Sequence, residues 1–118
     1  MEKYIIIGKN KKIKHVDDVV FETDIYDNSG ILDPSIMGFI RYEIFDDHIQ
    51  LIQIFIDPEE RRGGYGFKLV KSLERITRKE GKKKIVTYTG MNKGDVFGDF
   101  LISMEFRITK PGRWEKQL

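Results

Sequence analysis

The sequence predicts one α/β domain of the layered α+β kind, built on a mixed, mostly antiparallel and twisted sheet. Short apolar and β-branched runs recur between turn signals along the chain, as is typical of strands. In the middle, one such run passes through a glycine-rich turn into an amphipathic helix, and another strand follows. This order is that of a right-handed strand–loop–helix–strand crossover. The 118 residues are enough for one hydrophobic core, so we expect a single domain over residues 1–118.

The first part of the chain contributes the predicted antiparallel strands. Strands are predicted over Lys3–Ile7, Ile36–Phe45 and His48–Ile56, with a basic turn over 9–14 and an ambiguous segment, strand or short helix, over His15–Asn28. The last two strands form a hairpin around a tight turn at Asp46-Asp47. The strand that ends at Ile56 is mostly apolar, so we expect it in the centre of the sheet.

The second part begins with the predicted helix Gly64–Glu80. Its apolar residues, starting with Phe67, recur at spacings of three and four and form one stripe. Gly81 stands where a left-handed C-cap belongs. Further elements are predicted as a strand over Lys84–Thr89, a helix over Asn92–Met104, and a closing strand pair over Glu105–Thr109 and Arg113–Leu118.

The composition excludes several classes of protein. Apolar residues make up 40% and charged residues 34% of the chain, as in ordinary globular domains. There is no cysteine, which excludes disulfides, thiolate zinc sites and an acyl-cysteine intermediate. The apolar runs are too short to cross a bilayer, and the first residues do not read as a secretory signal. We therefore expect a cytoplasmic protein with no membrane partner. With two histidines and no clustered ligand spacing, we expect no metal site.

The glycine-rich turn has the chemistry of an anion site. The first N–H groups of a helix lack internal partners, and the helix dipole adds about half a positive charge there. Glycines allow positive φ and let a diphosphate lie against the main chain, while basic side chains supply charge-assisted contacts. The loop consists of Arg61, Arg62, Gly63, Gly64, Tyr65, Gly66, Phe67 and Lys68. A flexible basic turn is the alternative interpretation, but the strand before the loop and the helix after it favour the anion site.

The segment Ile52–Val70 resembles the central strand, pyrophosphate loop and following helix of the GNAT superfamily of N-acetyltransferases. Arg61, Gly64 and Gly66 stand at the positions of that family's Arg/Gln-x-x-Gly-x-Gly/Ala signature. The resemblance covers roughly residues 36–118 and implies a short member with a GNAT-like fold.

The resemblance also implies a cofactor and a reaction. Acetyl-CoA would be the co-substrate, and the acetyl group would pass directly to an amine in a ternary complex. Backbone groups of Ile54, Phe55 and Ile56 would bind the pantetheine arm. The N–H groups of residues 62–67 would hold the pyrophosphate, and Asn92 would touch the pantetheine from the facing helix.

Three features depart from the family pattern. Many members place a tyrosine in the second helix to protonate the departing thiolate, and here that position holds Leu101 or Asp99, depending on the register. Glu105 replaces the usual glycine. Only Gly8–Pro34 is available for the two N-terminal helices that form much of the acceptor site. We therefore expect an acceptor site that is open or completed by a second subunit in a homodimer.

The attacking amine must lose a proton, so a base is needed near the middle of the central strand. The position where the family often has glutamate matches Gln50, which cannot accept a full proton. His48 lies two residues earlier, and Glu43 lies on the partner strand. A turn histidine and an ordinary surface carboxylate are the alternative interpretations of these two residues. A water relay along backbone carbonyls needs no side chain.

The charge distribution bears on the acceptor. Residues 15–50 hold nine carboxylates opposed only by Arg41, which favours a cationic primary amine as acceptor, on a small molecule or a protein. Residues 61–84 hold ten basic and two acidic residues. A non-catalytic CoA-binding module is the main rival interpretation. A nucleic-acid-binding protein that uses the basic helix face is a third, and the carboxylate-rich half argues against it.

Overall fold

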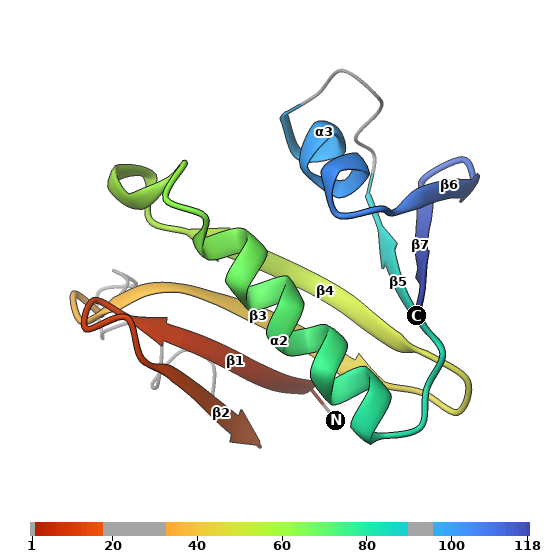
Figure 1. The fold of residues 1–118 in the computed structure, drawn as a ribbon, viewed down its shortest axis with the longest axis horizontal. Coiled ribbons are helices and arrows are strands. Elements are labelled where there is room, and N and C mark those ends of the chain that lie inside the picture. The colour runs from red at the N-terminus through yellow and green to blue at the C-terminus, as the bar shows by residue number, and fades with distance from the viewer. Residues whose placement is uncertain (1, 18–32, 90–95) are drawn as a thin grey trace.

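A computed structural model describes residues 2–17, 33–89 and 96–118. Its strands form one seven-stranded sheet in the order β2-β1-β3-β4-β5-β7-β6 (Figure 1). The strand pairs are antiparallel except for β4 with β5, which is parallel. The mixed, mostly antiparallel sheet is confirmed, and β4 lies at its centre as predicted.

The strands are β1 (Glu2–Gly8), β2 (Ile13–Asp17), β3 (Ile36–Ile44), β4 (Ile49–Ile56), β5 (Lys84–Tyr88), β6 (Arg107–Lys110) and β7 (Arg113–Gln117). A short 3-10 turn, η1 (Pro58–Glu60), precedes the helix α2 (Tyr65–Lys79), and α3 (Val96–Ser103) follows β5. Most predicted elements are present with ends shifted by a few residues. The exception is β2, which begins inside the predicted basic turn and pairs with β1 as an edge strand.

Helix α2 lies across one face of the sheet, over β1, β3 and β4 (Figure 1). Its buried Leu69, Val70 and Leu73 pack in the main core cluster together with side chains from the strands and from α3. Two residues differ from the predicted pattern. Phe67 was expected in the apolar stripe but is 51% exposed, whereas Ser72 is 1% exposed. Val70, Leu73 and Thr77 of the predicted stripe are buried, so this face of the helix covers the sheet as predicted, and Phe67 in the first turn stays exposed.

Both helices end in a Schellman motif. After α2, the N–H groups of Gly81 and Lys82 bond to the carbonyls of Arg78 and Thr77, and Gly81 has φ +73°. After α3, the N–H groups of Glu105 and Phe106 make the equivalent bonds to Ile102 and Leu101. Here the left-handed position is held by glutamate, with φ +71°. The C-cap predicted at Gly81 is confirmed, and Glu105 occupies a position that suits glycine.

Strand β4 contains a β-bulge at Ile52. The register against β3 shifts there, so one residue of β4 has no partner of its own. Before the bulge, Ile49 and Leu51 face the core under α2; after it, Ile54 faces that core and Phe55 joins a smaller cluster on the opposite face. The bulge therefore changes which residues of β4 face α2, from odd-numbered ones before it to even-numbered ones after it.

The two halves of the sheet share a short parallel pairing. It joins Ile49–Leu51 of β4 to Ile85–Thr87 of β5 and ends next to the bulge. The Thr87 hydroxyl also donates to the Leu51 carbonyl at 2.9 Å. Beyond this point β4 and β5 diverge, and α3 lies beyond the open end (Figure 1). We call this divergence the fork.

A buried ion pair also connects the two halves. Glu74 of α2 and Lys116 of β7 are 2% and 5% exposed, and Lys116 Nζ lies 3.0 Å from Glu74 Oε1. Since α2 packs mainly on β1, β3 and β4 and only lightly on β5, this pair strengthens the link between the first half of the sheet and β7.

The far end of β4 is fixed by Asp57. Its N–H donates to the Met37 carbonyl at 2.8 Å, and its carboxylate accepts from the Glu59 N–H and from Lys9 Nζ, both at 3.0 Å. The Lys9 hydrogen bond, followed by the one from the Glu59 backbone, holds the pKa of Asp57 below its ordinary value. The β1–β2 turn is thus tied to the start of the glycine-rich loop.

We expect Glu105→Gly to stabilise the protein. An L-residue in the left-handed region costs about 1–2 kcal/mol, and glycine loses about 0.5–1 kcal/mol of that gain through its greater chain entropy. The net gain of about 0.5–1 kcal/mol should raise Tm by about 2–5 °C in a scanning calorimeter. Glu105→Ala keeps the strained backbone and is the control. An equal rise in both variants would contradict the backbone explanation.

We expect Lys9→Met to raise the pKa of Asp57, measured by carboxyl NMR titration. A carboxylate whose pKa is lowered by folding stabilises the fold above its unfolded pKa, and this contribution is lost as the pH falls through the folded value. The destabilisation of Lys9→Met in denaturant unfolding should therefore be present at pH 7 and shrink towards acid pH. Lys12→Met, on the same turn, is the control. A pH-independent difference would count against the ion pair.

Candidate functional site

The loop between β4 and α2 is held at its start by side-chain bonds to the main chain. Arg61 Nε donates to the Ile56 carbonyl at 3.1 Å, which turns this exposed side chain back towards the end of β4. Two residues then adopt positive φ, Arg62 at +73° and Gly64 at +80°. Gly64 is the N-cap of α2. These left-handed residues turn successive backbone N–H groups outward, as in anion-binding nests.

The N–H groups of this loop have no internal acceptor. Lys68 is the first residue of α2 whose N–H is bonded, to the Gly64 carbonyl at 3.1 Å. Within the described parts of the chain, the N–H groups of residues 62–67 make no hydrogen bond. The N-cap has no side-chain bond, and the first turn has no acidic residue. The positive end of the helix is therefore uncompensated, which suits an anion.

The three glycine positions of the loop lack a Cβ for different physical reasons. A Cβ on Gly64 would meet no atom within 4 Å, so this residue is required by its positive φ. A Cβ on Gly63 would lie 2.5 Å from the Tyr65 ring. A Cβ on Gly66 would lie 3.2 Å from the Phe100 ring, so Gly66 allows α3 to pack against the start of α2. Of the three, only Gly64 has a positive φ.

The edge of β4 beyond the fork has backbone groups directed away from β3. Asp57 bonds to β3 through its N–H, and alternate residues of an antiparallel strand direct their backbone groups to opposite sides. Ile54 and Ile56 therefore direct theirs towards the open side, and Phe55 directs its groups to β3. Of the three residues predicted to bind pantetheine, only Ile54 and Ile56 have this orientation. Both side chains are half-buried and pack against the core.

Helix α3 lies beyond the open end of the fork with two half-buried rings, Phe97 and Phe100, whose centroids are 6.3 Å apart. Asn92, the predicted pantetheine contact, lies outside the described residues. Leu101 is completely buried in the core, and Asp99 is exposed. A buried leucine has no proton to give, so this position of α3 offers no acid.

The predicted bases separate into two groups. Glu43 and Gln50 are direct partners in the β3–β4 pairing, half-buried on the face opposite α2, one residue from the fork. His48 lies in the hairpin turn, where it stacks on Phe45 and bonds to the Asp47 carboxylate. This bond lowers the pKa of Asp47. The structure therefore brings Glu43 and Gln50 together and leaves His48 outside the fork.

Tyr88 is a residue that the sequence analysis did not single out. It directly follows Thr87, the last residue of β5 paired with β4, and alternation puts it on the face that carries Glu43. Its ring is 52% exposed, and the Arg113 guanidinium lies 5.7 Å from the ring centroid. The pattern of the strand Lys84–Thr89 could not have indicated this, because the place where the pairing stops is set by β4.

The acids predicted to mark the acceptor site are not gathered in the described residues. Asp33 bonds to Ser35 at the start of β3, whereas Asp46 and Asp47 occupy the turn at its other end. No group of three potential metal ligands converges in the parts of the chain that the structure describes. Nor is any described helix long and apolar enough to span a membrane.

Comparison with known structures supports the fold. The PaiA N-acetyltransferase of Thermoplasma acidophilum in complex with coenzyme A has a TM-score of 0.65 at 23% identity over 75% of this chain. An acetyltransferase from Bacillus cereus has a TM-score of 0.65 at 16% identity over 100% of the chain. The ribosomal-protein-S18-alanine N-acetyltransferase of Escherichia coli has a TM-score of 0.59 at 16% identity over 72%. The chain spans 57%, 74% and 63% of these structures' own lengths.

Sequence comparison identifies the family of the chain. A search of curated proteins finds no significant match. The family model of the acetyltransferase (GNAT) family matches residues 15–95, which include β3, β4, the glycine-rich loop, α2 and β5. Because this match covers more than half of the residues, the chain belongs to the GNAT acetyltransferase family.

Proposed function

We propose that the chain is an N-acetyltransferase that moves an acetyl group from acetyl-CoA to a primary amine. The observation that carries this proposal is the run of unbonded N–H groups at residues 62–67, next to the fork and with no acidic residue in the first turn of α2. These groups would hold the diphosphate, with Arg61, Arg62 and Lys68 adding charge. The pantetheine arm would lie along the β4 edge, where Ile54 offers its backbone groups and Ile56 its N–H, while the Ile56 carbonyl accepts from Arg61.

The reaction is a direct transfer in a ternary complex. The amine nitrogen attacks the thioester carbonyl, the carbon–sulfur bond breaks, and the CoA thiolate takes up a proton. Helix α2 covers one face of the sheet at the fork, so the amine would approach from the opposite face. Glu43 on that face is the base we propose for the amine, assisted by its partner Gln50. Tyr88, also on that face, is the acid we propose for the thiolate.

A cationic amine is the acceptor that the charges favour. Glu2 and Glu43 are direct partners in the β1–β3 pairing, on the face that carries Gln50. Glu2 already forms an ion pair with Arg41, whose Nη1 lies 3.7 Å from Glu2 Oε2, so Glu43 is the carboxylate that we propose the cationic amine approaches. An amine must be neutral to attack, so Glu43 would attract the ammonium form and then remove its proton. A homodimer whose second copy completes the acceptor site, and a cytoplasmic location, stay predictions.

A non-catalytic CoA-binding module is the second candidate. It is favoured by the lack of a tyrosine at either position where the resemblance puts the family's acid, since these positions hold the buried Leu101 or the exposed Asp99. This alternative shares the diphosphate loop and differs only in turnover. Binding of acetyl-CoA without acetylation of any member of a broad amine panel would select it.

We expect acetyl-CoA and CoA, but not ATP, to raise Tm. A ligand that binds only the native state stabilises it by about 2.7 kcal/mol at a hundredfold excess over Kd. Gly64→Leu should abolish this shift, because its side chain would project into the open space over the loop. Gly81→Leu is the control, since Gly81 also has positive φ and open space around it. A shift that survives in Gly64→Leu would refute the loop as the diphosphate site.

We expect Glu43→Gln and Tyr88→Phe each to lower kcat about a hundredfold or more, with little change in KM for acetyl-CoA. General acid–base groups contribute about 10²–10⁴ to a rate. Release of the CoA thiol can be followed with a thiol reagent, without background from a chain that has no cysteine. Glu105→Gln, at the end of α3, is the control. A loss of activity in His48→Ala instead of Glu43→Gln would place the base in the hairpin turn.

A further inference from the structure

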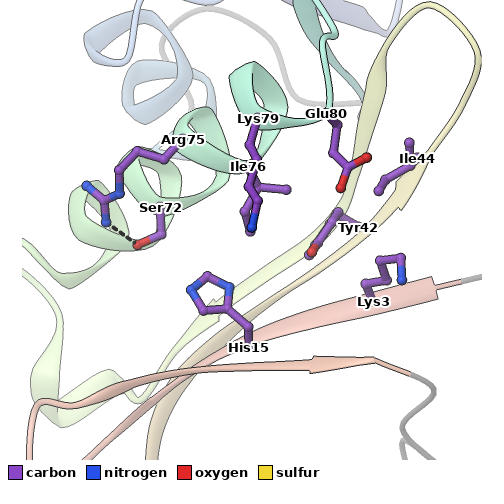
Figure 2. Close-up of a pocket in the computed structure, with 9 residues that line it drawn as sticks. All are labelled: Lys3, His15, Tyr42, Ile44, Ser72, Arg75, Ile76, Lys79 and Glu80. Atoms are coloured by element: carbon purple, nitrogen blue, oxygen red, sulfur yellow. Dashed lines mark hydrogen bonds between the residues drawn. The ribbon is translucent and has the colours of Figure 1, made fainter.

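A polar cavity separate from the fork lies between the C-terminal half of α2 and strands β1, β2 and β3. Its volume is about 330 Å³, at the lower end of the range for small-molecule pockets. Figure 2 shows side chains descending into it from α2 and His15 rising towards it from β2. Two buried hydroxyl-bearing side chains line it, Ser72 at 1% exposure and Tyr42 at 4%.

Regular spacing on each element brings these side chains together. Ser72, Arg75 and Lys79 stand at positions i, i+3 and i+7 of α2, so they share one face of the helix. On the sheet, Lys3 pairs with Tyr42, and His15 pairs with Ile5, whose side chain lies in the core under α2. All of these positions belong to the face that α2 covers. This explains why Ser72 is buried although its spacing predicts an exposed position.

The cavity is rich in cationic groups. Lys3, Arg75 and Lys79 line it together with His15, and Glu80 is the one carboxylate among its lining residues. Arg75 donates from Nη2 to the Ser72 hydroxyl at 3.0 Å, which holds the guanidinium at the wall (Figure 2). Lys79 has no ion pair among the described residues. Like charges around one cavity repel, and a bound anion reduces this repulsion.

We propose that this cavity binds a small molecule that carries a phosphate group. A guanidinium with fixed geometry, two ammonium groups and two buried hydroxyls match the oxygens of a phosphate. The site is separate from the diphosphate loop. Arg75 lies eleven residues from Gly64, or about 16 Å along the helix at 1.5 Å per residue. It is therefore an additional anion site, suited to an effector or to part of a substrate remote from the reacting amine.

The ligand is a small molecule and not a nucleic acid. A nucleic-acid backbone needs an extended basic surface, such as the outer face of α2. Ser72 on the helix side and Tyr42 on the sheet side are both buried within a small cavity, where a polymer cannot reach them, whereas a single phosphate group can.

The test is an NMR titration of the intact ¹⁵N-labelled chain with inorganic phosphate, glucose 6-phosphate and a single-stranded DNA oligonucleotide. Saturable shifts at Lys3, His15, Ser72 and Lys79 with phosphate or the sugar phosphate are expected. Tighter binding of glucose 6-phosphate identifies an organic phosphate as the ligand, and equal binding identifies phosphate itself. Shifts confined to residues 62–67, shifts that do not saturate, or saturation of the cavity residues by the oligonucleotide alone would each overturn the proposal.

Matched variants locate the site. Arg75→Ala and Lys79→Ala should each weaken phosphate binding about tenfold, because each removes a charge-assisted contact. Arg78→Ala and Lys83→Ala remove the same charges from residues that do not line the cavity, and their affinity should stay within about twofold of the original. An equal loss in all four variants would show general charge attraction and overturn the site. Thermal response to CoA is measured in the same variants, so a failure here is distinguishable from a failure of the diphosphate loop.

Discussion

The extra residue at Ile52 determines where β4 stops pairing with β5, and the proposed site depends on that point. A bulge increases the local twist and interrupts the ladder, and the parallel pairing ends at Leu51, directly before it. The strand then continues against β3 alone. Its other edge is left with the backbone groups of Ile54 and Ile56 directed at an unpaired side. Without the bulge, β4 would present its opposite face to α2, and the continuous ladder would occupy that edge.

The glycine-rich loop is held in place from three directions. Asp57 ties its start to β3 and to the β1–β2 turn, Arg61 bonds back to the end of β4, and Gly66 packs under Phe100 of α3. Between these points the main chain uses left-handed residues that aim its N–H groups outward. The loop is therefore preorganised, and an anion would meet the donors without first having to order them.

Local patterns predicted the fold well, and pairing between strands explains what they missed. The helix from Gly64, the cap at Gly81 and the hairpin at Asp46-Asp47 follow from short-range chemistry, and all are present. The bulge depends on how β4 pairs with β3, so the residues of the β4 segment alone could not predict it. Its trace is the spacing of Gln50 and Gln53, which breaks the alternation of the strand. The Phe67 and Ser72 errors arose in the same way, because the sheet decides which positions at the margins of the apolar stripe are covered.

The ion pair between Glu74 and Lys116 has a mechanical consequence. The two half-sheets share backbone pairing over only three residues of each strand, a short hinge that offers little resistance to rotation. The pair bridges the halves behind this hinge, under α2 and away from the face that carries Glu43. Separating this pair is costly, since Glu74 keeps Lys71 and Arg78 nearby but the buried Lys116 ammonium loses its counter-charge. The angle between β4 and β5 is thus stabilised by two side chains that lie outside the proposed ligand site.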